Sequence, residues 1–300
     1  MKADIRTTHE NGFSLIELLV SLAILVPLMG AVVTLFSDGV NQHSAEQSSS
    51  AMNQEARSAL ELMTLEIAQA GSHRDASTTT TSVIPASAST QTASLTSSSG
   101  FTVGDYVDVD TGTNKETVQV TAAGTNSISG IFRIAHANGV PVRLFALPYL
   151  AGMIPTAGLG ANSSATTTKL KFFGDVNADG TLYYVEYDYD SANAQITRSM
   201  TPITQGSKNA AQPLVGNIKP NSVQFTLYTD SQSVVASVSL TLTALNTVKS
   251  GSKYQETALS SRTVIPSAIA GSALLSEIQQ YGGVNRLPPT PSHVTTWSSQ

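Results

Sequence analysis

The first strong pattern along the chain is a long apolar run near the N-terminus. Residues 15–36 are almost wholly apolar, and the run contains one carboxylate, Glu17. About 20 apolar residues in a helix cross a hydrocarbon core about 30 Å thick, so the run predicts a membrane-spanning helix. Pro27 and Gly30 interrupt it and indicate either a tolerated kink or local flexibility that helps the helix to leave the bilayer.

After residue 36 the chain becomes polar, but one apolar stripe continues at a spacing of three and four residues. Its members are Met52, Ala56, Ala59, Leu60, Met63, Ile67 and Ala70. This spacing predicts that the helix continues with one buried face, and charged residues such as Glu66 are expected off that face. Gly71 is a suitable C-terminal stop. A helix over 13–70 would be about 87 Å long at about 1.5 Å per residue.

Shorter alternating segments follow, and they predict β-strands. Residues 72–100 are rich in Ser and Thr with few large apolar side chains, so we expect a linker there. Residues 101–147 predict an inserted β-rich subdomain. From residue 169 onward, apolar and polar positions alternate as in a one-sided antiparallel sheet. The prolines near the end of the chain predict an extended or flexible tail.

These patterns predict an α+β protein. A long N-terminal α-helix, transmembrane in its first half and amphipathic in its second, packs on a C-terminal antiparallel β-sheet that carries an inserted β-rich subdomain. The predicted organisation is a leader at 1–12, the helix at 13–71, the linker at 72–100, the inserted subdomain at 101–147, a β-sheet head at 148–270 and a flexible tail at 271–300.

Composition and charge narrow the class of protein. Charged residues make up 12% of the chain, which is low, and favours an exported β-rich protein over a cytosolic enzyme. The 16 basic and 21 acidic residues give a net charge of -5 and no reason to expect binding to nucleic acid. With no cysteine, the chain has neither a disulfide nor a thiolate metal ligand.

The sequence does not predict an enzyme. It contains none of the HExxH, GxSxG, GxxxxGK[ST] and GxGxxG patterns that mark common catalytic or phosphate-binding sites. Five histidines are scattered singly along the chain, at His9, His43, His73, His136 and His293. We expect His136 to be a turn or packing residue.

Glu17 needs a functional explanation, because an acidic residue at the centre of a membrane helix costs roughly 2.5 to 3.5 kcal/mol on insertion scales. The sequence Gly-Phe-Ser-Leu-Ile-Glu-Leu-Leu-Val-Ser-Leu-Ala-Ile, starting at Gly12, resembles the class III signal of type IV prepilins and type II secretion pseudopilins. The resemblance implies cleavage between Gly12 and Phe13 and N-methylation of Phe13. It also implies that Glu17 acts in assembly by neutralising the N-terminus of a neighbouring subunit.

A second, looser resemblance covers the strand pattern from 169 to 266, which is similar to larger PilW-like minor pilins and J-type pseudopilins. It implies a minor pilin, since a bulky head would crowd a densely repeated filament surface. The implied partners are a prepilin peptidase, an inner-membrane assembly platform and other pilins. The chain would be a single-pass inner-membrane protein before assembly, and part of a pilus or pseudopilus in the periplasm or at the cell surface afterwards.

Two alternatives to a minor pilin stay open. One is a pseudopilin of a type II secretion system, and the other is a membrane-tethered adhesin or binding module that never polymerises. A simple tether has no use for the charge of Glu17, whereas an assembling subunit does. The sequence does not distinguish a pilus from a pseudopilus, and it identifies neither the position in the filament nor an adhesion target.

A candidate calcium loop follows the pattern D-x-[DN]-x-[DN]-G-x₅-E. Its ligands would be Asp175, Asn177, Asp179, the carbonyl of Thr181 and Glu186. Oxygen ligands at these spacings wrap a hard cation, so a structural calcium ion is one interpretation. The alternative is a hairpin turn with solvated acids, because 182–190 alternates like a strand and would carry Glu186 along the sheet. No other cofactor is expected.

Overall fold

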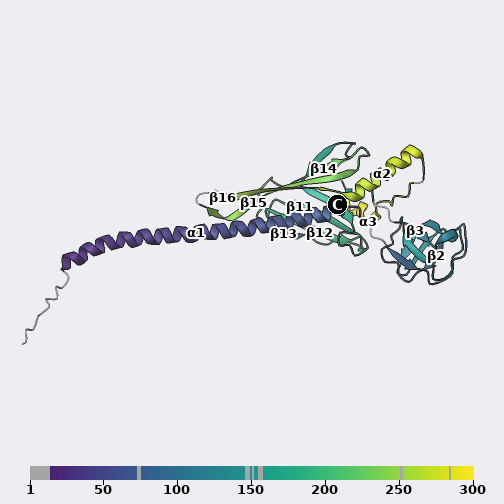
Figure 1. Ribbon diagram of the computed structural model, residues 1–300, viewed down its shortest axis with the longest axis horizontal. Coiled ribbons are helices and arrows are strands. Elements are labelled where there is room, and N and C mark those ends of the chain that lie inside the picture. The colour runs from purple at the N-terminus through teal and green to yellow at the C-terminus, as the bar shows by residue number, and fades with distance from the viewer. Residues whose placement is uncertain are drawn as a thin grey trace, which may run out of the picture. The chain divides into compact units, whose positions relative to one another are not determined.

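The computed structural model describes residues 14–72, 76–145, 149–150, 152–154, 158–250, 253–283 and 285–300, and at positions 249, 250 and 253 it describes the backbone alone. Figure 1 shows the helices and strands of the chain, coloured from purple at the N-terminus to yellow at the C-terminus. By its internal contacts, the chain divides into two compact units. The first comprises Met1–Ala51 and Asn246–Gln255, and the second comprises Met52–Leu245 and Glu256–Gln300.

The long N-terminal helix α1 runs from Leu15 to Ala68 without interruption. Pro27 lies inside it, so the helix accommodates the lost backbone donor without ending. The predicted stop is present at Gly71, whose φ of 72° is a left-handed conformation that favours glycine. A Cβ at this position would lie 2.5 Å from the carbonyl oxygen of Tyr149.

The second half of α1 buries the predicted apolar stripe. Met52, Ala56, Ala59, Met63, Ile67 and Ala70 are all buried. They pack with aromatic and aliphatic residues of the strands, including Phe172, Tyr187 and Phe225. The helix therefore forms one side of the main core, as the sequence predicted.

Two antiparallel sheets complete this core. A five-stranded sheet has the order β13-β12-β11-β10-β8, and a four-stranded sheet has the order β16-β15-β14-β9. The strands are β8 (Met153–Ile154), β9 (Ser164–Thr167), β10 (Lys169–Gly174), β11 (Tyr183–Asp190), β12 (Gln195–Pro202), β13 (Gln212–Val215), β14 (Gln224–Thr229), β15 (Val235–Ser250) and β16 (Lys253–Val264). Together with α1 they confirm the predicted α+β fold class.

The inserted subdomain is larger than predicted. Its elements are β1 (Ser77–Thr79), β2 (Gln91–Ser94), β3 (Tyr106–Val109), the short helix η1 (Gly112–Asn114), β4 (Glu116–Gln119), β5 (Ala122–Gly124), β6 (Ser127–Gly130) and β7 (Pro141–Leu144). They form sheets of order β1-β7-β3-β4 and β2-β6-β5.

The two small sheets close into a barrel. A bridge between Thr80 and Leu95 joins the β1 side to the β2 side, and two residues separate β4 from β5. Ile84 and Leu95, which fall in the predicted linker, are buried in the barrel core with Phe132. The segment 72–100 therefore supplies strands in place of a free linker, because Ile84, Ala93 and Leu95 are buried in this small core.

The C-terminal region contains helices where we expected a flexible tail. Helix α2 (Pro266–Tyr281) has proline in its first turn, and α3 (Ser292–Ser298) follows. Val294 and Trp297 of α3 are buried in a third apolar cluster with Tyr184. The prolines between the helices suggested an extended chain, but burial of Val294 and Trp297 holds this end of the chain on the sheet.

Candidate assembly site

The predicted cleavage residues, Gly12 and Phe13, lie outside the described residues, which begin at Ser14. Ser14 immediately precedes α1, and its backbone N–H donates to Oε2 of Glu17 over 3.3 Å. This is the Glu-to-N-cap half of a capping box. The carboxylate lies in the first turn, where the helix dipole favours negative charge. The Glu17 side chain is thus directed towards the start of the helix. There it contacts Ser14, which follows the predicted new N-terminal residue, Phe13, by one position.

The first part of α1 makes no contact that buries it. Every residue from Ser14 to Ser44 is exposed, and Ala45 is the first buried residue of the described chain. This helix is long and apolar enough to cross a membrane, and it is the one such helix among the described residues. So large an apolar surface requires a lipid or protein environment.

Two hydroxyl groups within this segment are hydrogen-bonded to the helix backbone. The Ser21 hydroxyl donates to the carbonyl of Glu17 at 2.8 Å, and the Thr34 hydroxyl donates to the carbonyl of Gly30 at 3.0 Å. Such bonds hide hydroxyl groups from an apolar environment. Glu17 therefore remains the one formally charged side chain between Ser14 and Ser37.

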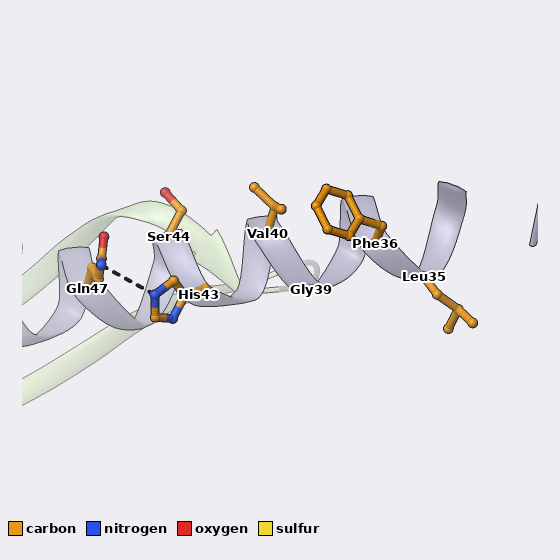
Figure 2. Close-up of a pocket in the computed structure, with 7 residues that line it drawn as sticks. All are labelled: Leu35, Phe36, Gly39, Val40, His43, Ser44 and Gln47. Atoms are coloured by element: carbon orange, nitrogen blue, oxygen red, sulfur yellow. Dashed lines mark hydrogen bonds between the residues drawn. The ribbon is translucent and has the colours of Figure 1, made fainter. Parts of the chain in front are cut away.

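A shallow groove lies on α1 where the apolar run gives way to polar residues (Figure 2). It is lined by Leu35, Phe36, Gly39, Val40, His43, Ser44 and Gln47. Gly39 has no side chain to fill the groove, and a Cβ added at this position would meet no atom within 4 Å. The lining comes from the helix alone.

The candidate calcium loop lies between β10 and β11, and its first carboxylate caps the turn. Asp175 accepts the backbone N–H of Asp179 and of Gly180, each at 3.0 Å. Asp179 accepts the N–H of Thr181 at 2.8 Å and the hydroxyl of Tyr183 at 2.9 Å. Although desolvation opposes it, these hydrogen bonds lower the pKa of Asp179. Asn177 is exposed in the same turn.

The structure places Glu186 away from this turn, within β11. Its carboxylate accepts the hydroxyl of Tyr184 at 2.7 Å and contacts Nζ of Lys208 at 3.3 Å. Lys171 lies opposite it on β10, and burial lowers the pKa of this lysine. Among the described residues, no group of three or more His, Asp or Glu side chains is placed to hold a metal ion. The predicted ligands are therefore only partly brought together.

Two buried polar clusters were not found by sequence reasoning. Glu66, expected on the solvent side of α1, is buried and pairs with Arg198 and Tyr187. His136 is buried between Glu116 and Asp110 in the barrel. The burial of Glu66 could have been suspected from the sequence, because Glu66 precedes Ile67 and lies at the edge of the apolar stripe. Nothing in the local sequence pairs His136 with residues 20 and 26 positions earlier.

Comparison with known proteins bears on this N-terminal segment. Residues 7–33 match the family described as the prokaryotic N-terminal methylation motif. No curated protein and no solved structure matches the chain. The matched motif contains Gly12, Phe13 and Glu17, and it indicates a type IV pilin-like or pseudopilin-type protein that is processed by a prepilin peptidase. Such a signal implies assembly with other pilins, and with the apolar helix it fits membrane anchoring before assembly.

Proposed function

We propose that the chain is a minor pilin, a structural subunit that is trimmed after Gly12 and built into a type IV pilus through α1. The observation that carries the proposal is the combination of a methylation motif with a helix exposed from Ser14 to Ser44 and charged at Glu17. An apolar helix of this length needs lipid before assembly and neighbouring helices after it. The role is structural and requires no catalysis.

The head supports a minor position in the filament. It combines the two main sheets with an inserted barrel and two C-terminal helices. This bulk is easier to place at or near a filament tip than in every repeat of a filament wall. A pseudopilin of a secretion system uses the same signal, so the filament type has to be tested in the organism's own assembly systems.

Processing is tested by intact mass and N-terminal sequencing of the full chain, produced with and without its cognate prepilin peptidase. We expect a chain that begins at N-methylated Phe13 only when the peptidase is present. The variant Gly12→Val should remain uncut, because a side chain blocks the backbone approach that glycine allows. Gly39→Ala should be cut normally. An uncut wild-type chain, or one cut beyond Phe36, would contradict the proposal.

Assembly is tested separately with Glu17→Ala. This variant should be trimmed but should not enter filaments, because the amino group of a neighbouring subunit would lose its counter-charge in an apolar core. Glu46→Ala removes an exposed carboxylate from the same helix and should assemble normally. Normal incorporation of the Glu17 variant would favour a simple membrane tether.

A further inference from the structure

A cleft of about 370 Å³ lies in the second unit, where one end of the inserted barrel meets the main sheet. Its walls come from residues 97–102 between β2 and β3, residues 123–125 at the end of β5, residues 180–182 before β11 and residues 203–204 after β12. Small-molecule sites have volumes of about 300 to 1,000 Å³. The cleft is therefore large enough for a small organic ligand.

Hydrogen bonds join the walls of the cleft to one another. The Ser98 hydroxyl donates to the carbonyl of Gly124 and, at 2.8 Å, to that of Thr125, so the segment 97–102 is held to the end of β5. The N–H of Ile203 donates to the carbonyl of Leu182 at 2.9 Å and joins the other two wall segments. Because the walls are fixed in advance, a ligand does not have to order them on binding.

The cleft is uncharged, because none of the described residues that line it has an ionisable side chain. Two carboxylates close to it in the sequence bind other groups. Asp105 accepts the N–H of Thr102 at 2.7 Å and its hydroxyl at 2.9 Å, and Asp179 accepts the N–H of Thr181 at 2.8 Å. A charged ligand would lose hydration here without gaining a counter-charge, so the lining favours a neutral ligand.

Three of the four wall segments each contribute an exposed hydroxyl group. These belong to Ser99, Thr125 and Thr204, and they have no hydrogen-bond partner in the part of the chain that the structure describes. Each hydroxyl can donate one hydrogen bond and accept two. A purely apolar ligand would cover them without replacing their bonds to water, which costs free energy. The ligand that suits this lining therefore carries several hydroxyl or amide groups.

The buried part of the lining is mainly apolar. Phe101, Leu182 and Ile203 are buried, and Ser98, also buried, already uses its hydroxyl in the wall. The lining thus combines buried apolar side chains with exposed, uncharged polar groups. A pyranose ring has the same two parts, since its C–H groups form apolar faces and its hydroxyls surround the edge. Removing those C–H groups from water against apolar side chains favours binding.

We propose that this cleft binds a neutral carbohydrate. The C–H groups of one pyranose ring contact the buried apolar residues, and its hydroxyls bond to Ser99, Thr125 and Thr204. The site goes beyond the proposed function, because it lies in the second unit and requires neither trimming nor assembly. A subunit that carries it binds sugars through its head, whichever type of filament contains it.

Saturation-transfer NMR on the full chain tests the site. The chain is held in phosphatidylcholine nanodiscs, because detergents with sugar headgroups would compete for the cleft. The probes are the methyl glycosides of glucose, galactose, mannose and N-acetylglucosamine. For ligands of this size we expect at least one of them to bind with a Kd of about 1 mM. The uronic acid of the same ring stereochemistry, and cyclohexanol with its single hydroxyl, should bind about tenfold more weakly or less.

Substitutions assign the binding to this cleft. Thr125→Val and Thr204→Val each remove one exposed hydroxyl and keep the shape of the side chain. Each should weaken binding about 3- to 10-fold, as expected for one hydrogen bond, and the two together about 10- to 100-fold. Thr166→Val makes the same change at an exposed position of β9 outside the cleft and should leave the Kd unchanged. Circular dichroism checks that all variants are folded.

Three results would overturn the site. They are the absence of transfer to every neutral glycoside, binding of cyclohexanol or the uronic acid as tight as that of the best glycoside, and a Kd that the double variant leaves unchanged. The second result would make the cleft an unselective hollow, and the third would place the bound sugar elsewhere on the chain. None of them alters the outcome of the processing and assembly tests, so the carbohydrate site and the proposed function fail separately.

Discussion

Glu66 on α1 and Arg198 on β12 form a charge-assisted pair between residues 132 positions apart in the chain. Nε of Arg198 donates to Oε2 of Glu66 at 3.0 Å, and Nη2 donates to Oε1 of the same carboxylate. The hydroxyl of Tyr187 on β11 also donates to Oε2. Although burial alone would lower it, pairing with Glu66 raises the pKa of Arg198. The pair fixes the rotation of α1 on the sheet.

Removing one member of this pair should destabilise the head. Glu66→Ala leaves the guanidinium of Arg198 partly buried without its carboxylate, and we expect a loss of about 2 to 4 kcal/mol in the free energy of unfolding. Urea unfolding of the full chain in detergent, followed by circular dichroism, measures this loss. Glu61→Ala, on the exposed face of α1, should change stability by less than about 0.5 kcal/mol. Similar losses for both variants would contradict a specific role for the pair.

His136 should stabilise the inserted barrel. Its Nε2 lies 2.8 Å from Oε1 of Glu116 and its Nδ1 lies 3.4 Å from Oδ2 of Asp110, so the ring joins the β3–β4 turn to the loop before β7. His136→Phe keeps an aromatic ring but leaves both carboxylates without this partner. We expect a loss of about 2 to 4 kcal/mol.

Hydrogen exchange with mass spectrometry localises that loss. Amide protons between Ser77 and Leu144 should exchange faster in the His136 variant, while those of α1 should not. His43→Phe, at an exposed position of α1, provides the matched control. Faster exchange throughout the chain would mean that the barrel does not respond as a separate cooperative unit.

The docking of α3 can be read from the one tryptophan of the chain. Trp297 is buried, and its ring centroid lies 5.8 Å from that of Tyr184. His293 adds a hydrogen bond from its ring to the carbonyl of Ile203 at 2.7 Å. Val294→Asp places a charge in this apolar cluster and should release α3, because an unpaired buried carboxylate is costly.

Tryptophan fluorescence measures this release. In the Val294 variant the emission of Trp297 should shift to longer wavelength and become accessible to acrylamide. Thr295→Asp adds the same charge at the next, exposed position and should leave the emission unchanged. A red-shifted emission in the wild-type chain would show that α3 is not docked in solution.

Periodic and local features were predictable, and long-range pairings were not. The stripe from Met52 to Ala70 predicted α1 and its buried face, because a helical repeat is visible in residues only three and four positions apart. The partner of Glu66 is set by the antiparallel register that places Arg198 opposite Tyr187. Trp297 looked like part of a tail because Tyr184, on which its ring packs, lies 113 residues earlier in the chain. The burial of a short segment with few apolar residues, such as α3, can be recognised only when the residues that it packs against are known.

The turn after β10 gives a test of the calcium hypothesis. Asp175 accepts two backbone N–H groups, so Asp175→Ala should cost about 1 to 2 kcal/mol through loss of these caps. We expect the same loss in calcium and in a chelator, measured as a shift in thermal midpoint. Asn177→Ala, which removes only a predicted ligand side chain, is the control. A loss that is much larger in calcium would establish the metal site.

Alkaline pH should unfold the head through three buried tyrosines. Burial raises the pKa of Tyr149, Tyr184 and Tyr187 far above 10, and the neighbouring carboxylates Asp105, Glu186 and Glu66, respectively, raise it further. In the unfolded chain these phenols ionise near pH 10. Above that pH the folded state binds more protons than the unfolded state, so stability falls as the pH rises.

Each such tyrosine lowers stability by at most about 1.4 kcal/mol per pH unit, so the three together contribute up to about 4 kcal/mol per unit. Absorbance at 295 nm should show the three buried tyrosines ionising together with the unfolding transition. Tyr187→Phe should reduce the slope by about one third relative to the wild-type chain. An equal slope in the variant and the wild-type chain would mean that Tyr187 ionises without unfolding, contrary to its burial against Glu66.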